Sequence, residues 1–402
     1  MWLAMTEGKL PHGVLYVSSV SGMGGAEFSL LELATHLDRT HFRPFLLVSE
    51  DGLLAQRFRA AGIQTIYGDF PFFSRRQPWV YLKSIWRIVS VVRRCGVSLV
   101  HVNCDRAVPH AVLATRLAGV PCLCHIHDMI RAWFLPSYVR YLNWSDRIVA
   151  DSRATARRCV AAGMDQRKLS VIYECFEMER YSSTGDSERE AFRQEFGLSN
   201  RHVAIGLVGQ VLRSKGHEEF VRAAMVVASE CSEAMFFVVG DDAMSSDKGF
   251  LIGLRRLVGE SGLDGKFVFT GYRSDIPRVM AGLDIVTVPS LEEPFGRVVV
   301  EALAARRPVV ASRGGGVPEI IEHGVTGFLF PPKDYEAMAE YLLQLCRSPE
   351  LRARMGERGP EAVARFDVGE HVRQFEELYL ELLENNRTRT APGRNLKPPL
   401  GE

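Results

Sequence analysis

Short apolar segments alternate with amphipathic helical segments along almost the whole chain, and this alternation restricts the possible folds. In the first half, strands are predicted near 14–19, 44–49, 99–103, 121–127 and 147–151, joined by helices near 27–37, 53–61, 81–94 and 152–162. In the second half, a helix near 188–196 precedes strands near 203–208, 235–239, 267–270, 284–288 and 309–311. This alternation is typical of parallel α/β sheets, whose ligands bind beyond the C-terminal ends of the strands.

The chain is long enough for two such domains. Its 402 residues are 47% hydrophobic, which is enough to fill more than one core. A polar stretch without periodicity, 174–186, is interpreted as the linker, so the first domain is predicted at 1–180 and the second at 187–366. A last helix is predicted near 368–384, and the polar, basic stretch 385–402 is predicted to be a disordered tail.

The overall composition excludes several functional classes. A formal charge of +1 gives no general attraction to nucleic acid. The N-terminus has no signal-peptide pattern and no segment reaches the ~20 apolar residues of a spanning helix, so a cytoplasmic protein is expected. The eight cysteines include no C-x-x-C pair and are expected to be reduced packing residues. Either Met1 or Met5 is the natural start.

A strand-to-helix junction in the second half carries the most specific chemical signal. The apolar run 283–288 is typical of a buried strand, and a helix is predicted to begin near Gly296 or Arg297. The free backbone N–H groups of that helix would suit a phosphate. Glu293 and Glu301 lie eight positions apart on either side of this anion site. Two acceptors around one phosphate suit a nucleotide that carries sugars at both ends.

The pattern Glu-Pro-Phe-Gly-x-x-x-x-Glu resembles the retaining glycosyltransferases of family GT4. The resemblance covers 290–334 in register and extends to segments in the same order along the chain: 24–27, 127–128, 215–216 and 238–241. It implies an α/β protein with the GT-B fold, in which two doubly wound Rossmann-like domains face each other across a cleft. It also implies that the last helix packs back on the first domain, and that neither a metal nor another cofactor is needed.

The same resemblance implies roles for residues of the second domain. Glu293, with the backbone of Phe295 and Gly296, would hold the donor sugar, and Glu301 would accept hydrogen bonds from the ribose. Lys215 would neutralise the diphosphate as the glycosidic bond breaks. The family usually has an arginine where this chain has Gln210. Either Arg213 substitutes for it, or Lys215 and backbone amides act alone.

The first domain contributes a histidine and a glycine loop. His127 ends a predicted strand, and the residues alone allow a metal pair with His125, a structural histidine or a histidine facing the cleft. The resemblance places it by the transferred sugar. The predicted catalytic residues are His127, Glu293 and Lys215, and the predicted donor-binding residues are Gly24, Gly25, Arg213, Lys215, Gly271, Tyr272, Glu293, Phe295, Gly296, Arg297 and Glu301.

The segment 70–94 combines aromatic residues with Lys and Arg. Its helical part is predicted to turn an apolar stripe toward the core and to expose its cations: Ile85, Ile88, Val89 and Val92 inside; Lys83, Arg87, Arg93 and Arg94 outside. Such a surface either packs as an ordinary acceptor-side loop and helix or contacts a membrane that carries a lipid-linked acceptor. The protein would then work at the inner face of the membrane.

We therefore expect a hexosyl-type glycosyltransferase that moves a sugar from a nucleotide-sugar donor to an acceptor hydroxyl in a glycan or lipid-linked acceptor. A role in bacterial envelope or exopolysaccharide synthesis is expected from the frequency of such enzymes. One alternative is a nucleotide-sugar epimerase or hydrolase on the same scaffold. Another is a non-catalytic subunit that supports an active partner. The sequence leaves open the base, the sugar, the acceptor and the oligomeric state.

Overall fold

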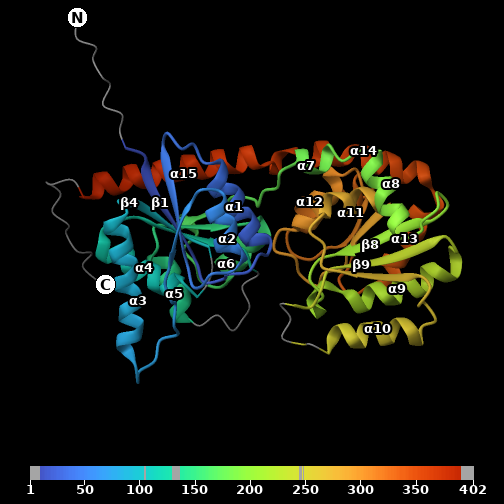
Figure 1. Ribbon diagram of the computed structural model, residues 1–402, viewed down its shortest axis with the longest axis horizontal. Helices are drawn as coiled ribbons and strands as arrows, with labels where there is room; N and C mark the ends of the chain where they lie inside the picture. Colours follow the sequence, from blue (N-terminus) through green and yellow to red (C-terminus); the bar gives the residue numbers. More distant parts are fainter. Residues whose placement is uncertain (1–9, 104–105, 129–135, 244–246, 248, 391–402) are drawn as a thin grey trace, which may run out of the picture. The chain divides into compact units, whose positions relative to one another are not determined.

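The computed structural model describes residues 10–103, 106–128, 136–243, 247 and 249–390 (Figure 1). The chain forms two compact units. The first takes its described residues from Met1–Asp151, Ala156–Ile172 and Gly369–Glu402, and the second consists of Ser152–Thr155 and Tyr173–Val368.

The first unit is built on a seven-stranded parallel sheet. Its strands are β1 (His12–Ser18), β2 (Phe42–Val48), β3 (Gln64–Tyr67), β4 (Val97–Val102), β5 (Cys122–Ile126), β6 (Arg147–Ala150) and β7 (Leu169–Val171). They lie in the order β3-β2-β1-β4-β5-β6-β7. The strands β2 and β3 lie on one side of β1 and the later strands on the other side, so the topological switch point lies between β1 and β4. The connecting helices are α1 (Gly25–His36), α2 (Leu53–Ala60), α3 (Pro78–Arg94), α4 (Val108–Ala118), α5 (Pro136–Trp144) and α6 (Arg153–Ala161).

The central strands of this sheet are buried on both faces. Val14, Leu15, Tyr16 and Val17 of β1 have no solvent-exposed surface. Continuous apolar runs form such strands because helices cover both faces of a parallel sheet. The predicted core stripe of α3 is confirmed, since Ile85, Ile88, Val89 and Val92 are all at most 4% exposed.

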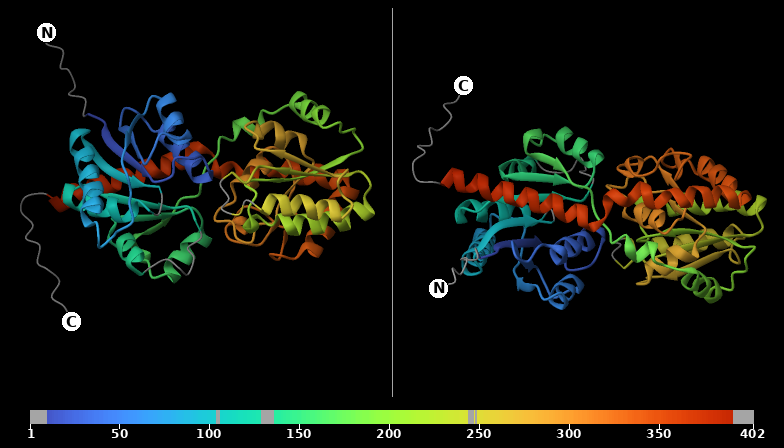
Figure 2. Two further views of the ribbon diagram at one scale, coloured as in Figure 1. Left: turned by 60° about the horizontal axis from the view of Figure 1, so that its bottom comes forward. Right: turned by 90° about the horizontal axis from the view of Figure 1, so that it is seen from above.

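The last helix, α15 (Val368–Thr390), lies along the first unit (Figures 1 and 2). The Tyr379 hydroxyl lies 2.6 Å from Nδ1 of His101, and it donates to the hydroxyl of Tyr16 at 3.3 Å. Near the start of the chain, the Asp38 amide donates to Glu376 at 2.7 Å. Residues more than 270 positions apart in the sequence therefore form one core.

The prediction of a disordered tail from 385 onward is wrong for its first six residues. The helix continues to Thr390, and residues 391–402 lie outside the described part of the chain. Asn386 donates to the carbonyl of Gly119 at 3.0 Å, and Arg389 pairs with Asp146 at 3.1 Å. These tertiary contacts hold a polar sequence in a helix that its own composition does not favour.

The stretch 174–186, interpreted as a linker, belongs to the second unit. It contains the short helix α7 (Glu179–Ser182) and two core residues, Phe176 and Tyr181, which are 0% and 6% exposed. The boundary therefore falls between Ile172 and Tyr173, earlier than expected. The sequence did not predict this packing, because only two aromatic residues interrupt a largely polar stretch.

The second unit repeats the architecture with a six-stranded parallel sheet. Its strands are β8 (Val203–Val208), β9 (Ala234–Val239), β10 (Phe267–Gly271), β11 (Ile285–Val288), β12 (Val309–Ser312) and β13 (Gly327–Phe330). The order is β10-β9-β8-β11-β12-β13, so the switch point lies between β8 and β11. The main helices are α8 (Asp186–Glu195), α9 (His217–Glu230), α10 (Phe250–Glu260), α11 (Ile276–Gly282), α12 (Arg297–Ala304), α13 (Tyr335–Arg347) and α14 (Pro349–Val363).

Candidate active site

The acidic loop of the second unit joins β11 to α12. The predicted helix start is confirmed, because α12 begins at Arg297 directly after Gly296. Gly296 has a φ of 112°, a backbone conformation that residues with a Cβ rarely adopt. Phe295 is only 2% exposed and packs edge-on against Phe366, with 5.2 Å between the ring centroids. The loop is therefore anchored by a buried ring immediately before the helix.

A glycine-rich loop after β12 packs against the acidic loop. The amide of Gly316 donates to the carbonyl of Glu293 at 2.8 Å. A Cβ on Gly315 would lie 2.0 Å from the same carbonyl oxygen, and one on Gly314 would lie 2.6 Å from that of Leu291. The three glycines are needed because the two loops pack backbone against backbone.

The loop after β8 is joined to the acidic loop in the same way. The Leu291 amide donates to the carbonyl of Ser214 at 2.8 Å. Gly216 has a φ of 75°, and a Cβ there would come within 2.1 Å of the carbonyl oxygen of Pro289. Lys215, between Ser214 and Gly216, is thereby held against the acidic loop.

These loops bring together two of the predicted catalytic residues. The Lys215 ammonium donates to both carboxylate oxygens of Glu293, at 2.7 and 3.0 Å, although 78 positions separate the two residues. Their side chains are 30% and 15% exposed. The pair lies beyond the C-terminal ends of β8 and β11, at the switch point where parallel α/β sheets bind ligands. A cation and an acceptor beside a helix N-terminus can bind an anion that carries hydroxyl groups.

Glu301 lies one helical turn after Arg297, the first residue of α12, and is 7% exposed. Its carboxylate accepts from Nε of Arg297 at 3.0 Å, and Nη1 of Arg297 donates to the carbonyl of Cys175 at 2.9 Å. Burial, together with the negative charge of Glu301, raises the pKa of Tyr181. The predicted ribose acceptor is thus held between an arginine and a tyrosine. Donor contacts by Glu301 and Arg297 remain predictions.

Arg213 has other acidic partners. Its guanidinium pairs with Glu218 at 2.8 Å and with Asp247 at 3.0 Å, and it lies 4.6 Å from the ring centroid of Phe250. The side chain is 64% exposed. To replace the arginine missing at Gln210, Arg213 would have to leave these partners. Its role with the diphosphate therefore remains a prediction.

Glycines also lie at the C-terminal ends of β9 and β10, which are on the side of β8 opposite to β11. Gly271 ends β10, and its carbonyl accepts from the Gly240 amide at 2.9 Å. A Cβ on Gly240 would lie 1.9 Å from the carbonyl oxygen of Gly209, so these strand ends pack closely. Tyr272, the next predicted donor residue, is 65% exposed. The predicted donor-binding residues did not include Gly209 and Gly240, although each directly follows a predicted strand.

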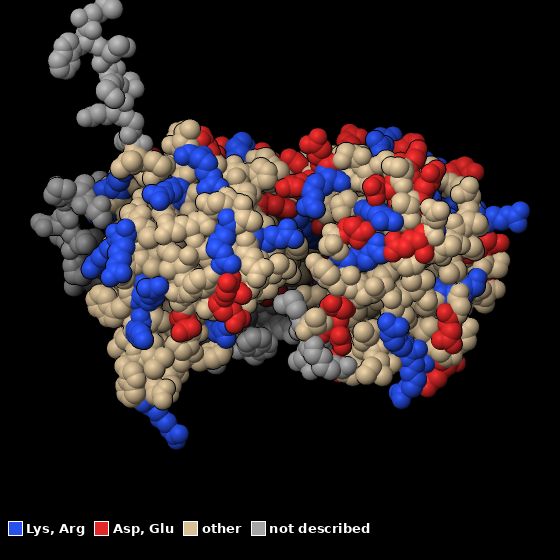
Figure 3. Space-filling model, in the orientation of Figure 1, with Lys and Arg blue, Asp and Glu red and all other residues tan. Residues whose placement is uncertain are grey.

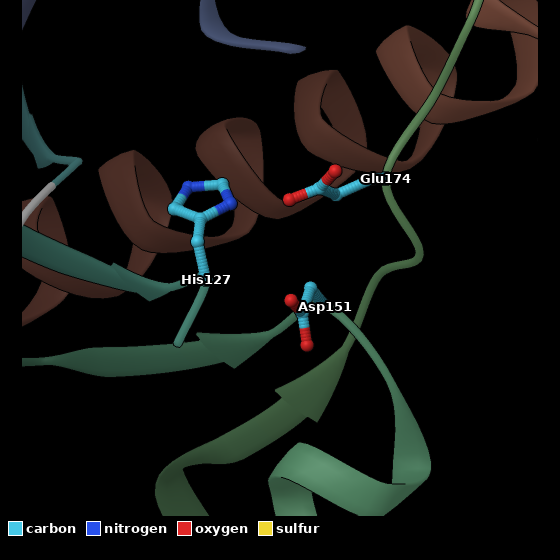
Figure 4. A group of neighbouring side chains, drawn as sticks. All are labelled: His127, Asp151 and Glu174. Carbon is cyan, nitrogen blue, oxygen red and sulfur yellow. The ribbon is translucent and has the colours of Figure 1, made fainter. Parts of the chain in front are cut away.

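In the first unit, His127 directly follows β5. Its Nε2 lies 2.8 Å from the side-chain oxygen of Asn103, at the end of β4. Asp151 directly follows β6, and Figure 4 shows His127 and Asp151 at the ends of their neighbouring strands. Sequence reasoning missed Asn103 and Asp151, yet both end predicted strands, which was the available signal.

His125, considered with His127 as a metal pair, belongs to the core. It is 4% exposed, and its ring centroid lies 5.2 Å from that of Phe375 on α15. Burial lowers the pKa of His125 well below its usual value, so the ring is neutral near pH 7. This geometry fits the structural interpretation of His125. The predicted absence of a metal from catalysis remains a prediction.

The glycine loop of the first unit leads into α1. Gly24 precedes the first helical residue, Gly25, and its amide donates to the Glu27 carboxylate at 3.0 Å. Glu27 therefore bonds back to the start of its own helix, which stabilises the turn. Contact of Gly24 and Gly25 with a donor remains a prediction.

Comparison with known proteins identifies the family. The family model described as Glycosyl transferases group 1 matches residues 188–362, and that described as Glycosyltransferase Family 4 matches residues 23–180. The alpha-D-kanosaminyltransferase of Streptomyces kanamyceticus is 28% identical over 307 residues, which cover 70% of this chain and 77% of the relative. The N-acetyl-alpha-D-glucosaminyl L-malate synthase of Bacillus anthracis is 25% identical over 313 residues, covering 75% and 79%.

Solved structures agree with this assignment. Anabaena HepE in complex with UDP-glucose superposes with a TM-score of 0.81 at 26% identity, covering 92% of this chain and 99% of that chain. A glycosyltransferase from Rickettsia africae has a TM-score of 0.83 at 22% identity, covering 93% and 99%, which supports the fold. This chain is therefore a glycosyltransferase that belongs to the GT4 family and has the GT-B fold.

Proposed function

We propose that this glycosyltransferase moves a hexosyl group from a nucleoside diphosphate sugar to an acceptor hydroxyl. The transferred sugar would retain its anomeric configuration. The observation that carries the proposal is the Lys215–Glu293 pair beside the start of α12. A lysine and free helix N–H groups suit a diphosphate, and a carboxylate suits sugar hydroxyl groups. In support, HepE was solved with UDP and with UDP-glucose.

The proposed division of labour follows the two ends of the donor. Lys215 and the N–H groups at the start of α12 stabilise the negative charge that grows on the diphosphate as the sugar leaves. Glu293 orients the transferred sugar, and Glu301 binds the ribose. Uracil is proposed as the base because HepE was solved with UDP. No metal ion takes part in this proposal.

A front-face reaction suits the ion-paired state of Glu293. Its carboxylate bonds to Lys215 through both oxygens, and such pairing lowers its strength as a nucleophile. We propose instead that the bond between the anomeric carbon and the phosphate oxygen breaks as the acceptor oxygen bonds on the same face. The acceptor proton then passes to an oxygen of the leaving diphosphate. Retention follows without a covalent sugar–enzyme intermediate.

The acceptor is proposed to be a glycan or a lipid-linked molecule of the bacterial envelope or an exopolysaccharide, reached at the inner face of the membrane. No helix in the described parts of the chain is long and apolar enough to cross a membrane. Contact with lipid would therefore involve a surface, and the exposed residues of segment 70–94 support that idea.

Incubation with a panel of nucleotide sugars, with and without acceptors, tests the proposal. Release of nucleoside diphosphate that depends on the acceptor, together with a product of unchanged anomeric configuration by NMR, would support it. Release without acceptor would favour a hydrolase, and conversion of the donor sugar without release would favour an epimerase. Lys215→Ala and Glu293→Gln serve as control variants. No turnover with any donor would favour the non-catalytic subunit.

A further inference from the structure

An unusually apolar and cationic surface lies on the first unit, away from the sheet. It consists of the exposed residues of the loop before α3 and of the outer side of α3, which we call the α3 face: Phe72, Phe73, Arg75, Arg76, Trp79, Leu82, Lys83, Trp86 and Arg87. Among its aromatic residues, Phe72 is 81% exposed, Phe73 and Trp79 are 63% exposed, and Trp86 is 56% exposed. Large aromatic side chains at such exposure commonly mark an interaction site.

Helical spacing explains why these side chains stay outside. Trp79, Lys83 and Arg87 follow one another at intervals of four residues, so they share one side of the helix. The opposite side of α3 is already buried, with Ile88 and Val89 each 1% exposed. The outer side chains of α3, including Trp79 and Trp86, are thus additional to a complete core stripe.

The charge of this segment differs from that of the chain. Residues 70–94 contain six Lys or Arg residues and no Asp or Glu, although the whole chain has a formal charge of only +1. Figure 3 shows blue side chains over a largely tan surface around α3, one of them projecting from its lower end. A local excess of cations beside exposed aromatic rings is complementary to an anionic apolar boundary.

The loop that presents Phe72 and Phe73 is fixed by a buried histidine of α4. Nε2 of His110 lies 3.0 Å from the carbonyl oxygen of Pro71, and its Nδ1 lies 2.5 Å from the hydroxyl of Ser84 on α3. Phe73 packs edge-on against Tyr81, with 5.4 Å between the ring centroids. The loop and the helix are therefore held together as one preformed surface, which reduces the entropy lost on binding.

We propose that the α3 face binds the surface of an anionic lipid bilayer. Trp79, Trp86, Phe72 and Phe73 would enter the boundary between headgroups and acyl chains, as aromatic side chains do at membrane interfaces. The surrounding cations would contact lipid phosphates. Since this surface lies on the first unit, its binding to lipid does not depend on the proposed donor chemistry.

Co-sedimentation with vesicles tests the proposal. The full chain should pellet at low salt with vesicles of phosphatidylcholine and phosphatidylglycerol, and much less with phosphatidylcholine alone. Raising the salt should release part of it, because exposed charges are screened over about 8–10 Å near physiological ionic strength. Lipids brominated along the acyl chain should quench the tryptophan fluorescence of the bound protein, because Trp79 and Trp86 would lie in the interface.

Two variants separate the apolar from the electrostatic contribution. Trp79→Ser with Trp86→Ser should lower the partition coefficient by at least about 10-fold and remove the quenching by brominated lipid. Arg75→Gln with Arg76→Gln should lower it by roughly 5-fold for each charge, since a Lys or Arg near an anionic surface contributes about 1 kcal/mol. The second variant should also weaken the salt dependence.

A matched control lies on the second unit. Ile252 on α10 is 71% exposed and the Arg256 side chain is 78% exposed, so Ile252→Ser with Arg256→Gln removes a similar pair from another surface. This variant should bind vesicles as the wild type does. The proposal is overturned if the wild type stays in the supernatant at low salt or if the α3-face variants pellet unchanged. A chain that dimerises through this face in the absence of lipid would equally overturn it.

Discussion

The Nζ atom of Lys215 lies 2.7 Å from Oε2 of Glu293, and this ion pair connects two loops at the switch point of the second sheet. Gly216 brings these two loops close enough for the pair to form, and Gly315 lets the loop after β12 pack against the backbone of Glu293. Each member thereby offsets the charge of the other. In the proposed mechanism a diphosphate that binds Lys215 has to compete with Glu293, so the pair would couple donor binding to the position of the carboxylate.

Glu293→Gln should separate binding from turnover. The substitution removes the negative charge that competes for Lys215, so affinity for nucleoside diphosphate should be unchanged or higher. Turnover should fall by one or more factors of ten, each about 1.4 kcal/mol, because in the proposed mechanism the carboxylate acts on the transferred sugar as charge develops on it. Steady-state kinetics and calorimetric titration with nucleoside diphosphate measure the two effects separately.

Glu292→Gln provides the matched control for this prediction, since Glu292 is the exposed neighbour in the same loop. It should change neither turnover nor affinity by more than about 0.5 kcal/mol, as for most surface substitutions. If Glu293→Gln lost nucleotide affinity while Glu301→Gln kept it, the donor would lie in the opposite direction along the motif.

Lys215→Ala and Arg213→Ala should differ in their effect on nucleotide binding. Loss of Lys215 should weaken nucleoside diphosphate binding by about 1.5–3 kcal/mol, the usual contribution of a hydrogen bond to a charged group. Arg213→Ala should cost less than about 1 kcal/mol, because Arg213 is largely exposed and already pairs with Glu218 and Asp247. Calorimetry distinguishes the two. Equal losses would instead assign Arg213 as the substitute for the arginine missing at Gln210.

The sequence predicted most central strands because each is a continuous apolar run followed by a loop. It missed β3, β7 and β13, which are short strands at the sheet edges. β3 and β7 are only partly buried, so burial shapes their sequences little. β13 is buried but has only four residues, begins with a glycine and is followed by two prolines. It also missed the last turns of α15. Asn386 and Arg389 are held there by residues of the first unit, and local propensity contains no information about such distant partners.

For the site, the sequence placed Lys215 and Glu293 at strand ends, and parallel topology brings such ends together. It did not predict that Arg297 bonds to Glu301 or that Arg213 bonds to Glu218, because a long arginine side chain can reach several acceptors. Asn103 was overlooked because an amide at a strand end resembles ordinary turn chemistry. Side-chain pairing therefore limited the prediction more than backbone topology did.

Glu301 should combine a binding role with a structural one. Glu301→Gln should weaken the binding of the donor and of free nucleoside diphosphate to a similar extent, with little change in turnover. The reason is that the ribose is unchanged between the ground state and the transition state. Glu301→Ala should also destabilise the second unit by about 3 kcal/mol, since it would leave the Arg297 side chain, only 13% exposed, without its carboxylate. Calorimetry and urea unfolding test the two parts. A turnover defect at full affinity would contradict the assignment to the ribose.

Acid should destabilise the first unit, and His110 should account for a defined part of the effect. Burial lowers the pKa of His110 to about 4, below the value near 6.5 expected in the unfolded chain. Between these two values the unfolded state binds more protons than the folded state, so stability falls as the pH decreases through this range. The contribution of neutral His110 to the free energy of unfolding should be complete above about pH 6.5. It should diminish by ~2 kcal/mol between pH 7 and pH 5.

His110→Gln tests this attribution, because glutamine offers a donor and an acceptor but does not titrate in this range. All five tryptophans fall within residues 1–151, so tryptophan fluorescence follows the unfolding of the first unit. The variant should be less stable at pH 7 but should lose ~2 kcal/mol less than the wild type between pH 7 and pH 5 in urea titrations. The remaining acid sensitivity should come from His101 and His125, whose pKa values burial also lowers. An equal loss in both proteins would show that His110 binds its proton equally well in the folded and unfolded states.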